Sequence, residues 1–213
     1  MDNQKLQTTR LLPKQLSIFA YNSSDSIANL FIRLKFTPNI ISFIALVLGL
    51  VAGVLFALAR PLWAGIVIIL CGFFDLLDGQ VAAKTNKKSL FGAIFDSTLD
   101  RYSEFFIYLG IAYYFRYHWA LWLCFFTFFG SYMVSYTRAR AEGLGVECQI
   151  GIMQRAERLG LLAIGSVLGA LFSAFDTVMI AVLITIAVVS NITAFQRIYH
   201  VKKIEIQKKT QNG

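Results

Sequence analysis

Charged residues are scarce in this chain. Asp, Glu, Lys and Arg make up 15% of its 213 residues, whereas soluble domains carry about 25%. Hydrophobic residues make up 57%, compared with roughly 45–50% in soluble domains. This composition leaves no room for a separate soluble domain and predicts an integral membrane protein.

Cysteine is rare as well. The three cysteines, Cys71, Cys124 and Cys148, are odd in number and lack metal-ligand spacing, so we expect reduced thiols without a chemical role. The polar start MDNQKLQTTR is not followed by a short apolar stretch and a cleavage site, so no signal peptide is expected.

Apolar residues gather instead in long runs. Each is close to the roughly 20 residues that a helix needs to cross a bilayer. We predict an all-α integral membrane protein with six transmembrane helices, at approximately 38–59, 62–83, 91–115, 118–141, 157–174 and 177–197. The six-helix domain spans 37–200, and the basic tail at 201–213 is expected to be cytoplasmic and disordered.

A shorter amphipathic pattern precedes the first run, within the cytoplasmic segment 1–36. Four apolar residues repeat at helical spacing, namely Ile27, Leu30, Phe31 and Leu34. Ser24 or Asp25 could cap this helix. The pattern predicts an interfacial helix on the cytoplasmic membrane surface, and a short connector helix packed on the bundle explains it equally well.

Basic residues fall almost entirely on one side of the predicted spans. The loops of the opposite side hold only Arg60 and Arg116. The basic side holds Lys84, Lys87, Lys88, Arg138, Arg140, Arg155, Arg158, Lys202, Lys203, Lys208 and Lys209. The positive-inside rule therefore places both termini in the cytoplasm. The net charge of +8 then favours anionic lipid headgroups over nucleic acid as the partner.

Four aspartates lie at the cytoplasmic ends of the second and third spans. Asp75 and Asp78 are three residues apart, and Asp96 and Asp100 are four apart, so each pair shares one helix face. A short turn between the helices lets all four converge. Their charge of −4 matches two divalent cations, and carboxylate oxygens suit Mg²⁺ or Mn²⁺.

The four aspartates also fit two roles without a metal. They could cap helices or pair with nearby cations, namely Lys84, Lys87, Lys88 and Arg101. They could also form the carboxylate cluster of an ion or proton transporter, although such clusters usually lie near the bilayer midplane.

The segment DLLDGQVAAKTNKKSLFGAIFDSTLD resembles the signature of the CDP-alcohol phosphotransferase family. That signature is D-x-x-D-G-x-x-A-R, then about eight residues, then G-x-x-x-D-x-x-x-D. The matching residues are Asp75, Asp78, Gly79, Ala82, Gly92, Asp96 and Asp100. The resemblance implies a six-helix fold, a two-metal site on the four aspartates and a role for Asp100 as general base.

The same resemblance implies a CDP-lipid site. The segment Thr37–Ile41 resembles the start of the family's first span, and the implied set is Pro38, Asn39, Ile40, Ile41, Asp75, Asp78, Gly79, Ala82, Ala83 and Ser89. Pro38 and Ser89 are also explained as helix-start residues. Ala83 stands where the family has a CDP-contacting arginine, and Lys84 is the candidate substitute, as a point charge without the guanidinium fork.

A second cluster lies at the same membrane face. SYTRARAEG and GIMQRAERL resemble the phosphatidylinositol-phosphate and archaetidylinositol-phosphate synthase branch, which uses 1D-myo-inositol 3-phosphate. The implied acceptor pocket is Ser135, Arg138 and Arg155, to which Arg158 and Arg197 are added. Alternatively these arginines anchor the helices, as we favour for Arg140, or form ion pairs with Glu142 and Glu157.

We therefore expect a homodimeric membrane enzyme of phospholipid biosynthesis. It would transfer the phosphatidyl-type group of CDP-diacylglycerol or CDP-archaeol to inositol phosphate and release CMP. The alternatives are the same chemistry with glycerol 3-phosphate or another polar alcohol, a transporter, and a non-catalytic CDP-lipid-binding relative.

Overall fold

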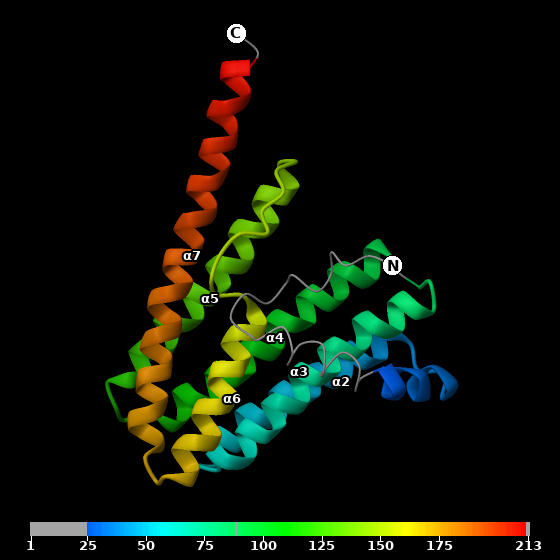
Figure 1. Cartoon of the computed structure of the whole chain (residues 1–213). Helices are drawn as coiled ribbons and strands as arrows, with labels where there is room; N and C mark the ends of the chain where they lie inside the picture. The colour runs from blue at the N-terminus through cyan, green and yellow to red at the C-terminus, as the bar shows by residue number, and fades with distance from the viewer. Residues whose placement is uncertain (1–24, 88, 212–213) are drawn as a thin grey trace.

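The computed structural model describes residues 25–87 and 89–211, and all of its regular structure there is helical (Figure 1). The long helices are α2 (Pro38–Ala57), α3 (Pro61–Lys84), α4 (Leu90–Tyr114), α5 (Ala120–Gly143), α6 (Arg155–Leu171) and α7 (Phe175–Gln211). Each predicted span coincides with one of them. Most of the N-terminal segment, with the capping candidate Ser24, and Lys88 lie outside the described residues.

Four of the long helices have the length and composition to cross a membrane: α2, α3, α5 and α7. The chain is thus a multi-pass membrane protein. Helix α4 falls short because it carries four charged residues, Asp96, Asp100, Arg101 and Glu104. Helix α6 has 17 residues and begins with Arg155, Glu157 and Arg158. Charged residues of the candidate site therefore contribute to the lower apolar content of both α4 and α6.

Helix α2 packs closely between α3 and α4 (Figure 1). Its approach to α4 depends on small residues, because a Cβ atom on Gly110 would lie 2.0 Å from the carbonyl oxygen of Gly53. Such contacts are typical of helix packing in membranes. Helix α6 packs against α3 and α7, and α7 packs against α5.

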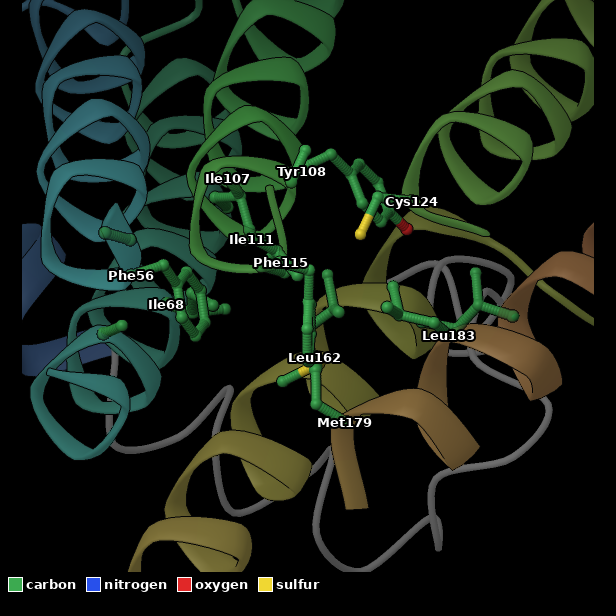
Figure 2. Close-up of a cluster of buried hydrophobic side chains, with 14 of the residues drawn as sticks. Phe56, Ile68, Ile107, Tyr108, Ile111, Phe115, Cys124, Leu162, Met179 and Leu183 are labelled. Atoms are coloured by element: carbon green, nitrogen blue, oxygen red, sulfur yellow. The ribbon is translucent and has the colours of Figure 1, made fainter. Parts of the chain in front are cut away.

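A buried apolar cluster joins all six long helices at the end remote from the aspartates. Figure 2 shows contributions from each helix: Phe56, Ile68, Ile107, Ile111, Cys124, Leu162, Met179 and Leu183. This cluster therefore packs the six helices against one another at that end. Cys71, Cys124 and Cys148 are free, buried thiols.

Helix α7 corrects the prediction of a disordered tail. It continues through 201–211 and extends well past its neighbours (Figure 1). Lys, Glu and Gln are good helix formers, and Glu205 and Lys209 form an i,i+4 ion pair of 2.7 Å. The disorder prediction is therefore wrong for these residues.

The amphipathic pattern before α2 does form a helix, at 25–33. Its Ala28 is fully buried and its Phe31 packs against the cluster containing Leu77 and Val81 of α3. Leu30 and Leu34 remain more than half exposed, at 52% and 59%. The segment therefore packs on the bundle, as a connector helix would, and presents apolar side chains outward, as an interfacial helix would.

Candidate active site

The four aspartates lie within electrostatic range of one another, but no three of them are close enough to hold one metal ion. Asp75 and Asp78 lie in the last turns of α3, and Asp96 and Asp100 lie in the first turns of α4. Asp78 is 6% exposed and accepts a 2.6 Å hydrogen bond from Ser42 of α2. Asp75, Asp78 and Asp100 each interact electrostatically with Asp96. The sequence reasoning missed Ser42, whose signal is its position one helical turn after Pro38.

Arg155, at the start of α6, lies between two of these carboxylates. Its Nη1 donates to Asp75 Oδ2 and lies 2.9 Å from Asp100 Oδ1. In this arrangement the described residues contain no three acidic, His or Cys side chains close enough to hold one metal ion. The predicted acceptor ligand Arg155 is thus in direct contact with predicted metal ligands.

The residues nevertheless fit divalent cations. Asp75 and Asp100 share one guanidinium, Asp78 is repelled by the other three aspartates, and the buried Asp75 Oδ1 has no hydrogen-bond partner among the described residues. A buried, unpaired carboxylate oxygen is costly. These hard oxygen donors are the kind that Mg²⁺ and Mn²⁺ bind.

A cavity of about 270 Å³ opens beside the aspartates, and we call it the donor cleft. Its lining comprises Pro38, Asn39, Ser42, Asp78, Gly79, Ala82, Lys87, Ser89, Gly92, Ala93 and Asp96. A Cβ atom on Gly79 would meet nothing within 4 Å, so this glycine faces open space. Pro38 begins α2, and the Ser89 side chain caps α4 by accepting a 2.9 Å hydrogen bond from the Gly92 backbone.

Four residues predicted to bind CDP-lipid do not line the donor cleft, namely Ile40, Ile41, Asp75 and Ala83. Ile41 is fully buried in a packed cluster and Ile40 is 46% exposed. They differ from Pro38, Asn39 and Ser42 because only the latter share the helix face turned to the cleft. Ala83 is exposed at the end of α3 and also lies outside the lining.

The structure places Lys84, the candidate substitute for the motif arginine, outside the donor cleft. Its Nζ lies 2.6 Å from Asp25 Oδ1 and 2.7 Å from Asn29 Oδ1, so it anchors the helix at 25–33. One step along a helix rotates a side chain by about 100°. Lys84 consequently points away from the donor cleft, whose lining does not include it.

A second cavity, of about 580 Å³, lies among α4, α5, α6 and α7, and we call it the acceptor cavity. It contains all five predicted acceptor residues, Ser135, Arg138, Arg155, Arg158 and Arg197, together with Asp100. Arg140 is not in the lining, as expected for an anchoring residue.

The arginines differ in their partners. Arg158 is 1% exposed and donates from Nε and Nη2 to Glu104, at 2.6 and 2.8 Å. Arg197 donates to the carbonyl oxygens of Ile150, at 2.9 Å, and Val134. Arg138 pairs with Glu142 at 2.8 Å and is about two-fifths exposed.

Two features of this cavity differ from the sequence prediction. Glu157 caps α6 by accepting a 3.1 Å hydrogen bond from the Gln154 backbone, so it does not pair with the arginines. Glu104, which was missed, is the partner of Arg158. Its available signal is the four-residue spacing from Asp100, which places both carboxylates on one face of α4.

Known proteins resemble the chain over most of its length. The sequence profile of the CDP-alcohol phosphatidyltransferase family matches residues 35–203. An archaetidylinositol phosphate synthase of Pyrococcus horikoshii is 40% identical over 80% of this chain and 86% of its own length. A phosphatidylinositol phosphate synthase of Mycobacteroides abscessus is 28% identical over 84% of this chain and 83% of its own length.

Solved structures agree with the sequence matches. Mycobacterium tuberculosis phosphatidylinositol phosphate synthase with CDP-DAG bound has a TM-score of 0.77 and 26% identity, over 84% of this chain and 92% of that one. The same enzyme with manganese and citrate also has a TM-score of 0.77 and 26% identity, over 84% of this chain and 88% of that one. None of these likenesses supports the transporter alternative. The chain belongs to the CDP-alcohol phosphatidyltransferase family and is therefore a membrane transferase.

Proposed function

We propose that this enzyme transfers the phosphatidyl-type group of a CDP-lipid to inositol phosphate and releases CMP. The observation that carries the proposal is the arginine-lined acceptor cavity, which reaches Asp100 and adjoins the donor cleft at Ala93. A phosphorylated acceptor suits this cavity because guanidinium groups match phosphate geometry. The relatives named for inositol phosphate products support the same acceptor.

The donor cleft would hold the nucleotide end of the lipid. Its glycines let a ligand approach the backbone closely, at Gly79 above all. Asp75, Asp78, Asp96 and Asp100 would hold two divalent cations, Mg²⁺ or Mn²⁺. When bound, these cations would neutralise charge on the donor pyrophosphate. A relative solved with CDP-DAG and with manganese supports both assignments.

Asp100 is the proposed general base. It is the one motif aspartate that lines the acceptor cavity, so its carboxylate is on the side from which an acceptor hydroxyl would approach. The hydroxyl would lose its proton to Asp100 as it attacks the lipid-bearing phosphorus. Arg155 and Arg158 each keep buried guanidinium nitrogens without partners in the described structure, and these could bind the acceptor phosphate.

The membrane placement is also part of the proposal. We infer six spans, with α4 and α6 crossing inside a protein environment, and the helix at 25–33 at the membrane interface. Both termini and the two cavities would face the cytoplasm, because basic residues gather at that end. Exposed aromatic side chains along α4 and α5, including Phe105, Phe129 and Tyr132, leave surface for a second copy in a homodimer.

An acceptor panel tests the proposed function. Purified protein with Mg²⁺ and CDP-diacylglycerol should release CMP with 1D-myo-inositol 3-phosphate and not with free inositol or serine. Release with glycerol 3-phosphate instead would replace the acceptor and keep the chemistry. No release with any acceptor, using CDP-diacylglycerol or CDP-archaeol, would contradict the enzyme assignment and favour a CDP-lipid-binding protein.

A further inference from the structure

The donor cleft has a single cationic side chain in its lining. Among the described residues that form it, only Lys87 is a lysine or arginine, and it faces a cavity that also contains Asp78 and Asp96. Position 83, where an arginine would stand in the family signature, holds an exposed alanine outside the lining. A nucleotide pyrophosphate carries several negative charges, so it is a suitable ligand for the Lys87 side chain in this cleft.

The end of α3 explains why Lys87 reaches the cleft. The helix ends at Lys84, and Asn86 adopts a left-handed conformation with φ of 52°. The Lys87 backbone N–H then donates to the Ala82 carbonyl at 3.2 Å. This is the six-to-one bond of a Schellman motif. It folds the chain back over the last turn of α3 and sets Lys87 beside Ala82 at the cleft wall.

Lys87 is also available to a ligand. Neighbouring Lys84 is held by Asp25 and Asn29. Lys87 is exposed and forms no ion pair or side-chain hydrogen bond with any residue in the described part of the chain. A lysine ammonium offers three donors on a flexible stem and binds phosphate as a point charge.

We propose that the Lys87 ammonium binds a phosphate group of the CDP-lipid and supplies the positive charge that Ala83 lacks. The proposal deepens the proposed function, because it assumes a CDP-lipid donor in this cleft. Lys87 is then a donor-binding residue that contributes mainly to substrate affinity. The chemical step remains with the aspartates.

The test compares Lys87→Gln with Lys87→Arg in the full-length protein. A hydrogen bond to a charged group is worth about 1.5–3 kcal/mol, so Lys87→Gln should raise the KM for CDP-diacylglycerol by roughly tenfold or more. Its kcat should stay within about twofold of the wild-type value. Lys87→Arg should keep the wild-type KM to within about threefold, because it retains the charge. Lys203→Gln, an exposed position on the projecting part of α7, is the matched control and should change neither constant.

Titration of the protein with CDP-diacylglycerol in detergent, without acceptor, gives a second readout. Lys87→Gln should weaken the Kd by a similar factor. If Lys87→Gln kept the wild-type KM and Kd, Lys87 would not be a donor-binding residue. The proposed transferase function would still stand. If wild-type protein released no CMP, the proposed function would fail, and an unweakened Kd in Lys87→Gln would then reject the lysine site separately.

Discussion

The donor cleft and the acceptor cavity adjoin at Ala93 and differ in the charged residues that line them. The lining of the donor cleft contains two aspartates and one lysine, whereas the lining of the acceptor cavity contains five arginines and three acidic residues. The donor aspartates belong to two consecutive helices, and the arginines come from α4, α5, α6 and α7. The contrast supports the proposal that metal cations and the nucleotide bind on one side and an anionic acceptor on the other.

The largest effect is expected for Asp100, whose loss should reduce turnover without abolishing substrate binding. Asp100→Asn removes the proposed base while keeping the size of the side chain, so kcat should fall by about 10²–10⁴-fold. CDP-diacylglycerol should still bind with measurable affinity, as checked by titration in detergent. Turnover near the wild-type rate would show that another group accepts the proton.

The next effect concerns the buried pair that joins α4 to α6. Glu104→Gln leaves the Arg158 guanidinium, 1% exposed, without its counter-charge. Removing one partner of a buried ion pair costs about 3–5 kcal/mol, so the thermal unfolding midpoint in detergent should fall markedly. The double variant Glu104→Gln/Arg158→Met should recover most of the loss. A single variant as stable as wild type would argue that the pair does not support the acceptor cavity.

The same contrast explains what the sequence could predict. The positions of the long helices and the grouping of the aspartates were predictable because apolar run length and i,i+3 or i,i+4 spacing act within one or two neighbouring helices. Glu104 and Ser42 were missed because their partners, Arg158 and Asp78, lie 54 and 36 residues away. Such pairs depend on how distant helices pack, and no local pattern encodes that packing.

The lysines show a second reason for failure. Moving from Ala83 to Lys84 changes the direction of the side chain by about 100°, so sequence proximity did not give spatial equivalence. The left-handed conformation of Asn86 reverses the chain direction. It brings Lys87, which is three residues after Lys84, to the cleft. A backbone conformation at a single residue thus decided which lysine faces the ligand, and Asn is only one of the residues that favour it.

A smaller effect tests whether Arg155, which contacts two of the aspartates, binds the acceptor. Arg155→Gln removes a guanidinium that contacts Asp75 and Asp100, and the KM for inositol phosphate should rise by roughly tenfold to a hundredfold. Arg155→Lys should give an intermediate value, because it keeps the charge but loses the fork. The KM for CDP-diacylglycerol should rise less. Equal increases for both substrates would assign Arg155 to the aspartates rather than to the acceptor.

The smallest effect is expected for Arg138, a partly exposed arginine of the acceptor cavity. Arg138 pairs with Glu142 and both are about two-fifths exposed, so the pair should contribute less than about 1 kcal/mol to stability. Arg138→Gln should keep the unfolding midpoint and raise the KM for inositol phosphate a few-fold at low salt. Arg140→Gln, outside the cavity lining, is the matched control and should leave the KM unchanged.

Salt separates two roles for Arg138. If it attracts the acceptor across solvent, its effect on KM should shrink as ionic strength rises to about 0.5 M, because the screening length falls from about 10 Å at 0.1 M toward about 3 Å at 1 M. An effect that persists at high salt would instead indicate direct contact with the acceptor phosphate. Arg138 would then bind the acceptor together with Arg155. The buried and the partly exposed arginines would differ in solvent exposure but share the same function.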